Sequence, residues 1–123
     1  MLDKLRDQAL NTLAAGSAGT LSSSGPAGLQ ASIITYRVAH HKIYTLIPIT
    51  SDHLFNLETE PRVILTTPEW QLIGAAAMIE PAPALLALFN SPETRWQQLV
   101  EITPQRVQLE PGQAQPRTTV DFQ

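Results

Sequence analysis

Four polar residues, Thr50-Ser51-Asp52-His53, precede a short apolar segment and could form an anion-binding turn. The first backbone N–H groups of a helix lack partners within the helix, and its dipole favours negative charge nearby. The hydroxyl groups of Thr50 and Ser51 can donate as well, but a phosphate loop normally adds Lys or Arg. This turn offers Asp52 and His53 instead, so the sequence alone leaves open whether it holds a phosphate.

Histidine and glutamate side chains are the other candidates for chemistry. His40 and His41 are adjacent, and adjacent side chains on a strand point to opposite faces, so we interpret them as a solvated pair in a turn. Haem ligation through one of these two residues or through His53 stays an alternative. Glu58 and Glu60 lie near the end of a predicted helix, where we expect both to be solvated. The sequence therefore identifies no metal site and no catalytic residue.

Length, composition and charge bound the class of protein. We expect residues 1–123 to form a single domain, because a chain of this length supports one hydrophobic core. Apolar residues make up 43% of the chain, which is ordinary for a globular protein. The net charge is −3 and the eight Lys and Arg residues are scattered, so there is no basic field for nucleic acid.

The chain contains no cysteine, which excludes disulfides, thiolate metal sites and cysteine nucleophiles. The first ten residues include the charged side chains of Asp3, Lys4, Arg6 and Asp7 and no apolar stretch like that of a signal peptide. No apolar run has the length of a membrane span. We therefore expect a cytoplasmic protein that does not insert into a membrane.

Hydrophobic spacing indicates a mainly β protein. Leucine residues at helical spacing predict an N-terminal helix over residues 2–15. Segments rich in β-branched, aromatic and other apolar residues predict strands; these segments are residues 18–24, 30–38, 43–49, 62–67, 70–80, 100–103, 105–110 and 117–122. His40-His41-Lys42 is the expected tip of a hairpin, and residues 112–116 are the expected loop before the last strand.

Three short helices are predicted between the strands. The first covers residues 52–59, with Thr50 or Ser51 as its cap and Pro61 after its end. The second is a short buried helix over residues 84–89. The third begins at Ser91-Pro92-Glu93 and includes residues 95–97, since a cap, a proline and an acid are typical of a helix start. Because strands and helices do not alternate, we expect a small antiparallel barrel of six to seven strands, not a parallel fold.

Gly74-Ala75-Ala76-Ala77 is an unusual run for a strand, because alanine and glycine are poor β-formers. Small side chains let another group approach the sheet closely. We expect that group to be the helix near residues 83–89 or a partner subunit. A flat ring lying on this surface is the functional alternative.

Four motifs in order carry a resemblance that covers residues 18–122. They are Gly19-Thr20-Leu21-Ser22-Ser23-Ser24-Gly25 with Ala31-Ser32, Ser51 to Val63 with its Asn56-Leu57 and Pro61-Arg62-Val63, Gly74-Ala75-Ala76, and Thr103-Pro104 with Arg106-Val107. Together they resemble the pyridoxamine-phosphate-oxidase-like, FMN-binding split-barrel family. The resemblance implies that the antiparallel barrel is a split barrel.

The resemblance also implies a homodimer with two FMN sites at its interface, where a small-molecule ligand would bind. The matching cofactor-binding positions are Ser32, Ile33, Ile34, Thr35, Arg37, Tyr44, Thr45, Thr50, Ser51 and His53. Residues 32–37 would run along the flavin, and residues 50–53 would hold its phosphate. The implied activity is that of a flavin-dependent oxidoreductase with an unknown small-molecule substrate, since the flavin supplies hydride and electron transfer.

The chain departs from this pattern where the family has two cations and the sequence has Asp52 and His53. Like charges at contact distance cost on the order of 1–4 kcal/mol near a protein surface, so we expect weak FMN binding that Asp52→Arg should tighten. Arg37 and Arg62 are the candidates to replace the missing cations. The alternative is a split-barrel homodimer that has lost FMN and acts as an interaction protein or binds haem, a deazaflavin or another ligand.

Overall fold

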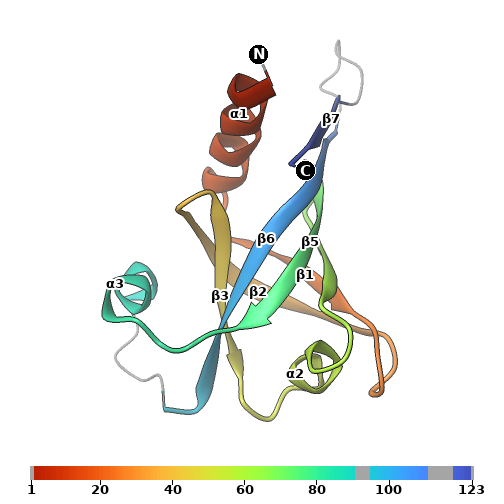
Figure 1. Ribbon diagram of the computed structural model, residues 1–123, viewed down its shortest axis with the longest axis vertical. Helices are drawn as coiled ribbons and strands as arrows, with labels where there is room; N and C mark the ends of the chain where they lie inside the picture. The colour runs from red at the N-terminus through yellow and green to blue at the C-terminus, as the bar shows by residue number, and fades with distance from the viewer. Residues whose placement is uncertain (1, 91–94, 111–117, 123) are drawn as a thin grey trace.

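Segments rich in β-branched, aromatic and other apolar residues form seven antiparallel strands in the computed structural model, which describes residues 2–90, 95–110 and 118–122 (Figure 1). The strands are β1 Ala18–Ser23, β2 Gln30–Ala39, β3 Lys42–Pro48, β4 Arg62–Thr66, β5 Trp70–Met78, β6 Gln97–Leu109 and β7 Thr118–Asp121. They pair in the order β3-β2-β1-β4-β5-β6-β7, and pairing of β3 with β6 closes the first six into a barrel. The expected small antiparallel barrel of six to seven strands is confirmed.

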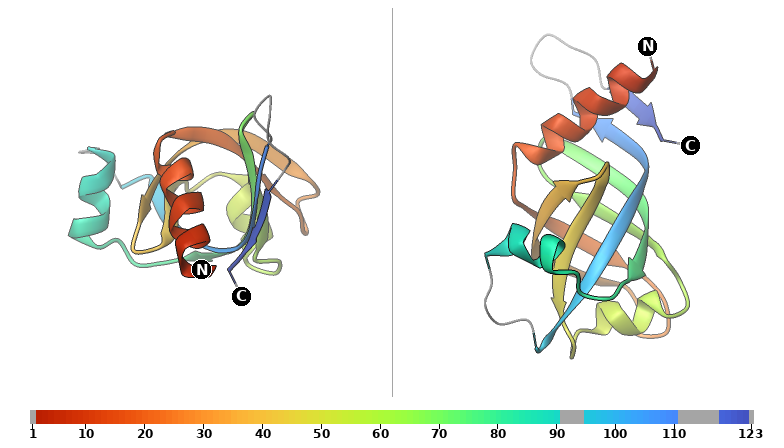
Figure 2. Two further views of the ribbon diagram at one scale, coloured as in Figure 1. Left: turned by 90° about the horizontal axis from the view of Figure 1, so that it is seen from above. Right: turned by 60° about the vertical axis from the view of Figure 1, so that its left-hand side comes forward.

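The strand β6 is long enough to have two partners along one of its edges. Residues 97–102 of β6 pair with β3, and residues 106–109 pair with β7. Its other edge pairs with β5 over most of its length. The barrel therefore closes through β6, and β7 extends the sheet beyond the closed part (Figure 2).

The strands β2 and β3 pair only near the hairpin that joins them. Residues 36–39 of β2 pair with residues 42–45 of β3. Farther from the hairpin, residues 30–35 of β2 pair with β1, whereas residues 46–48 of β3 pair with β6. The barrel is consequently split between the distal halves of β2 and β3.

His40 and His41 form the two-residue turn of this hairpin, as predicted. Their backbone φ angles are 53° and 63°, which matches the type I′ turn that joins twisted antiparallel strands. This turn more often uses Asn and Gly, because a side chain at positive φ is crowded. Both histidines therefore lie at the end of the hairpin opposite the split.

Helices lie at both ends of the barrel (Figure 1). The helix α1 Leu2–Ala14 buries Ala9, Leu10 and Leu13 against the core, and the buried hydroxyl of Tyr36 donates to the Leu13 carbonyl at 2.6 Å. At the opposite end is α2 Asp52–Leu57, whose predicted cap is confirmed, since Ser51 Oγ accepts from the His53 amide at 3.1 Å.

The predicted short helix at residues 84–89 forms, but the expectation that it is buried is wrong. It consists of α3 Pro83–Leu86 followed by the 3-10 helix η1 Ala87–Phe89, and none of these residues is buried. The segment lies outside the barrel, and none of its side chains belongs to the core, which the strands, α1 and α2 supply. Arg37 attaches it to β2 by donating to the Leu88 carbonyl at 3.1 Å and by lying 5.7 Å from the Phe89 ring centroid.

Two further predictions near β6 are wrong. Arg95 and Trp96 form a turn and Gln97 begins β6, so they do not continue a helix; the predicted start at residues 91–94 lies outside the described residues, as does the predicted loop at 112–116. The predicted break at Pro104 is also absent, because β6 runs through it. The register with β5 shifts between Ile73 and Gly74, and this bulge accommodates a proline within a strand.

The small residues of β5 permit close backbone approach. A Cβ atom at Gly74 would lie 2.8 Å from both Ile102 Cγ2 and the Thr103 carbonyl oxygen. Ala76 belongs to the core, and its amide donates to the Pro61 carbonyl at 2.8 Å. The helix α2 also packs against β5. The groups that approach the small residues of β5 are therefore on β6 and on the segment that contains α2 and Pro61.

Candidate functional site

A cleft of about 490 Å³ lies where β2 and β3 separate, and we call it the β2–β3 cleft. It is lined by Ser32, Ile33, Ile34, Thr35, Leu46, Ile47, Pro48, Thr50, Ser51 and His53. Seven of the ten predicted cofactor-binding residues are therefore together in one cleft: Ser32, Ile33, Ile34, Thr35, Thr50, Ser51 and His53. Whether they bind a cofactor stays a prediction.

The sequence reasoning missed the cleft wall formed by Leu46, Ile47 and Pro48. These residues follow Tyr44 and Thr45 on the same predicted strand, so the strand itself was the available signal. The wall supplies apolar surface opposite Ile33 and Ile34 of β2.

His53, the second residue of α2, is a buried polar residue beside the β2–β3 cleft. Its Nδ1 lies 2.6 Å from Ser23 Oγ, and its Nε2 lies 2.8 Å from Ser32 Oγ. Both ring nitrogens therefore have partners, one on β1 and one on β2. Only 4% of its surface is exposed, and this burial lowers the pKa of His53, although the charge of Asp52 acts in the opposite direction. The imidazole is accordingly neutral near pH 7 and joins three elements.

Asn56 extends this hydrogen-bond network to the turn between β1 and β2. Its Nδ2 donates to Ser23 Oγ at 3.2 Å and to the Gly28 carbonyl at 2.8 Å, and its Oδ1 accepts from the Ala27 amide at 2.9 Å. Asn56 is fully buried. A Cβ atom at Gly25, whose φ is 156°, would lie 3.0 Å from Asn56 Oδ1. The turn and α2 are thus held together at close range.

Several donors and acceptors of the loop before α2 are already used within the chain. The Ser51 amide donates to the Pro48 carbonyl at 2.9 Å, and the Leu54 amide donates to the Ser51 carbonyl at 3.1 Å. The His53 amide donates to Ser51 Oγ. Asp52 is exposed at the first position of α2, where it places a negative charge between two residues that line the cleft.

The remaining three predicted residues, Arg37, Tyr44 and Thr45, are not among the cleft lining. Arg37 donates to the carbonyls of Tyr36 and Leu88. The buried Tyr44 donates to Glu101 Oε2 at 3.0 Å, and burial is the main cause that raises its pKa.

Two further polar residues considered from the sequence, Thr45 and Arg62, also lie outside the cleft lining. Thr45 Oγ1 donates to the Thr35 carbonyl at 2.7 Å, so it holds β2 and β3 together where the split begins. Arg62 lines a different hollow, with Arg106 and Asp121. Neither Arg37 nor Arg62, the two candidates to replace the missing loop cations, lines the β2–β3 cleft.

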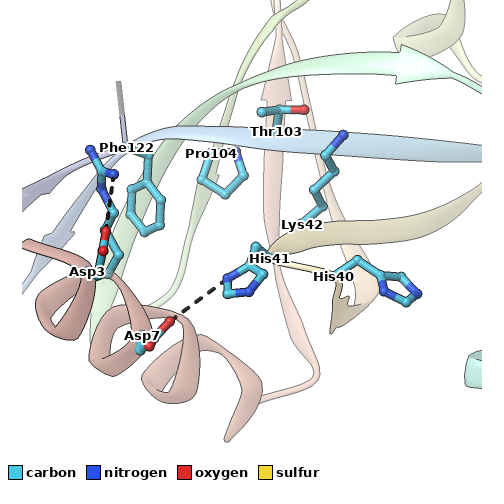
Figure 3. A pocket seen from close by; sticks show the side chains of 9 residues that line it. Asp3, Asp7, His40, His41, Lys42, Thr103, Pro104 and Phe122 are labelled. Atoms are coloured by element: carbon cyan, nitrogen blue, oxygen red, sulfur yellow. Dashed lines mark ion pairs between the residues drawn. The ribbon is translucent and has the colours of Figure 1, made fainter.

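A second hollow of about 470 Å³ lies between α1, the histidine turn and β6 (Figure 3). His41 Nδ1 is 3.9 Å from Asp7 Oδ1, and both side chains are largely exposed. His40 points away from Asp7 (Figure 3). Within the described part of the chain, no group of three or more His, Cys, Asp or Glu residues could hold a metal ion. This hollow therefore offers surface charges without a ligand set.

Comparison with known proteins identifies the fold. No protein-family model and no curated protein sequence matches the chain. A putative pyridoxamine 5'-phosphate oxidase from Listeria innocua superposes with a TM-score of 0.71 at 16% identity, covering 86% of this chain and 98% of that one. The general stress protein 26 from Bacillus anthracis gives a TM-score of 0.67 at 18% identity, with coverage of 85% and 92%.

A heme binding protein from Mycobacterium smegmatis is also similar, with a TM-score of 0.73 at 19% identity. The match covers 94% of this chain but 57% of that longer one. The chain thus has the split-barrel fold of pyridoxamine 5'-phosphate oxidase-like proteins. Among the described residues, no helix is both long and apolar enough to cross a membrane.

Proposed function

We propose that the chain is a homodimeric split-barrel flavoprotein that binds the flavin ring in the β2–β3 cleft, with FMN as a weak ligand. The observation that carries this proposal is the composition of the cleft: apolar walls from β2 and β3 meet hydroxyl groups at the end nearest α2. Its volume of about 490 Å³ lies in the range of small-molecule sites. Apolar walls suit a flat ring, and hydroxyl groups suit a polar side chain.

The residues of the cleft fit an FMN ring better than an FMN phosphate. None of the lining residues is Lys or Arg, and Asp52 stands beside them. A bound flavin would supply hydride and electron transfer, and the chain's own contribution would be to orient the ring between the walls. An oxidoreductase activity is part of the proposal, with a substrate that reaches the exposed side of the cleft.

Flavin is favoured over haem by the positions of the three histidines. Haem iron is commonly held by a histidine nitrogen. His53 is the only histidine among the residues that line the cleft, and both of its nitrogens are hydrogen-bonded. His40 and His41 lie at the other end of the hairpin. A haem in this cleft would therefore lack a free histidine ligand from this chain.

Titration of purified protein with riboflavin, FMN and hemin tests the proposed function. Flavin fluorescence should be quenched on binding, and Thr35→Trp should weaken binding at least tenfold because an indole fills the cleft from its exposed wall. The matched control is Thr103→Trp, which places the same side chain at an exposed position on β6. A protein that binds neither flavin would contradict the proposal, and a hemin complex with a sharp Soret band would favour the haem alternative.

A further inference from the structure

The charges of the side chains that line the β2–β3 cleft bear on which flavin this cleft would bind. Its lining is apolar except for serine, threonine and one histidine. His53 is therefore the only side chain of the lining that could carry a positive charge. An anionic ligand group would depend on this residue, on hydroxyl groups and on backbone amides.

The hydrogen bonds of His53 restrain it from serving an anion. Its two nitrogens are held at 2.6 Å by Ser23 and at 2.8 Å by Ser32, on two different strands. Turning the ring toward the cleft would break both bonds and leave the buried Ser23 with fewer partners. Asn56 fixes the position of Ser23 from the other side. Burial also disfavours the protonated form of His53.

The backbone around Ser51 offers little compensation. Its own amide is bonded to Pro48, and its carbonyl and hydroxyl accept from the next two amides of α2 that follow Asp52. Asp52 itself is exposed and carries a negative charge beside Ser51 and His53. The hydroxyl hydrogens of Thr50 and Ser51 suit a neutral hydroxyl group of a ligand better than a dianion, because a phosphate would be repelled by Asp52.

We infer that the β2–β3 cleft selects flavins without a terminal phosphate, of the riboflavin class, and that Asp52 is the residue that sets this preference. The inference rests on the proposed flavin site and specifies its ligand. A phosphate is close to a dianion at neutral pH, whereas the end of the riboflavin side chain is an uncharged hydroxyl. A penalty of about 1.4 kcal/mol corresponds to a tenfold difference in affinity. Riboflavin should accordingly bind at least tenfold more tightly than FMN.

Parallel titrations of riboflavin and FMN test this inference with the full chain. The variant Asp52→Asn removes the charge with little change in shape, and it should tighten FMN binding several-fold while leaving riboflavin binding unchanged. Asp7→Asn is the matched control, because it changes the net charge equally at an exposed position in the second hollow. It should leave the affinity ratio of the two flavins as in the wild type.

Salt provides an independent measurement. Raising the ionic strength screens repulsion between exposed charges, so FMN affinity of the wild-type protein should increase with salt and riboflavin affinity should not. Tighter binding of FMN than of riboflavin, or FMN affinity that falls with salt, would overturn the inference while leaving the proposed flavin site intact. Failure of both flavins to bind would overturn the proposed function, and the inference with it.

Discussion

His53 illustrates how one side chain can have a structural role at a position that suggests ligand binding. From the sequence, His53 is a predicted cofactor-binding position at the start of a short helix. The structure adds that its nitrogens join Ser23 and Ser32 of two neighbouring strands. The network continues through Asn56 to the turn between β1 and β2. This histidine stabilises the floor of the cleft as a neutral group.

The buried state of His53 predicts a pH-dependent stability. Its folded pKa lies below the ordinary value of 6.5, so between these two pKa values the unfolded chain binds more protons than the folded one. The free energy of unfolding should therefore fall as the pH drops below about 6.5 through the folded pKa. Urea denaturation at pH 7.5 and at pH 5 measures this change.

Two variants separate His53 from the other titrating groups in that measurement. His53→Asn should cost about 1–3 kcal/mol at pH 7.5, because Ser23 and Ser32 lose a buried partner. It should also lose less stability between the two pH values than the wild type does. His40→Asn, at the exposed turn, should retain the wild-type pH dependence. An equal pH dependence in wild type and His53→Asn would contradict the role assigned to burial.

The partners of His53 could not have been predicted from the sequence. Ser23 and Ser32 are 30 and 21 residues away in the chain, and no local spacing relates serine hydroxyls to a histidine at such distances. Motif resemblance predicted Ser32 and His53 as residues of one binding site, and in the structure both line the β2–β3 cleft. It gave no signal that the two side chains bond to each other.

At the scale of the element, Tyr36 couples α1 to the barrel. Its buried ring meets Trp70 edge-on with 5.7 Å between centroids, and its hydroxyl donates to the Leu13 carbonyl near the end of α1. A Cβ atom at Gly16 would lie 2.9 Å from that hydroxyl, so the chain passes closely over it. The helix thus depends on a polar contact as well as on its apolar face.

Removing that hydroxyl should therefore destabilise the docking of α1. Tyr36→Phe keeps the ring and should lower the free energy of unfolding by about 1–2 kcal/mol, because the Leu13 carbonyl loses its buried donor. Hydrogen exchange should show earlier opening of α1 than of β5. Thr12→Ala, which removes an exposed bond from Thr12 Oγ1 to the Gln8 carbonyl, should stay within about 0.5 kcal/mol of the wild type. Equal effects of the two substitutions would contradict the importance of the buried contact.

Most elements could be predicted from the sequence because local signals determine them. The strand β5, the cap at Ser51 and the histidine turn all form where the sequence indicates. The predicted break at Pro104 failed because β6 takes up one extra residue, Gln105, between its pairing with Ile73 and its pairing with Gly74, and this bulge is a property of the pair of strands. The predicted helix over residues 95–97 is absent for a similar reason, since pairing of Gln97 with β3 prevails over a helix-start signal.

At the scale of the whole molecule, closure of the barrel creates the split. Pairing of β3 with β6 joins residues as far apart as Ile43 and Ile102, and it directs the distal half of β3 away from β2. The antiparallel barrel followed from the pattern of strands, but the strand order did not, because no local signal selects such distant partners. The cleft therefore results from the strand order. Its residues 32–35 and 46–48 are each consecutive in the chain, but the sequence gives no local signal that the two segments line one cleft.

The surface beside the split predicts how two copies associate. Within the described chain, residues 30–35 of β2 have a strand partner on the β1 side only, and an unpaired edge of this kind favours further association. Leu29 and Ile33 are 79% and 80% exposed there. In the proposed homodimer these side chains are covered by the partner, which would also close the β2–β3 cleft.

Ile33→Asp tests this arrangement, because a carboxylate buried at the interface without a partner costs several kcal/mol. The wild-type chain should sediment as a dimer at micromolar concentrations, and Ile33→Asp should raise the dissociation constant at least about tenfold, since each tenfold requires about 1.4 kcal/mol. Leu5→Asp introduces the same charge at a partly exposed apolar position on α1, at the other end of the barrel, and should leave the dimer intact. A monomeric wild type would remove the homodimer from the proposal, and an unchanged dimer in Ile33→Asp would move the interface away from β2. Because Ile33 also lines the cleft, an interface at β2 would make the subunit partner a further wall of the ligand site, in addition to those from β2 and β3.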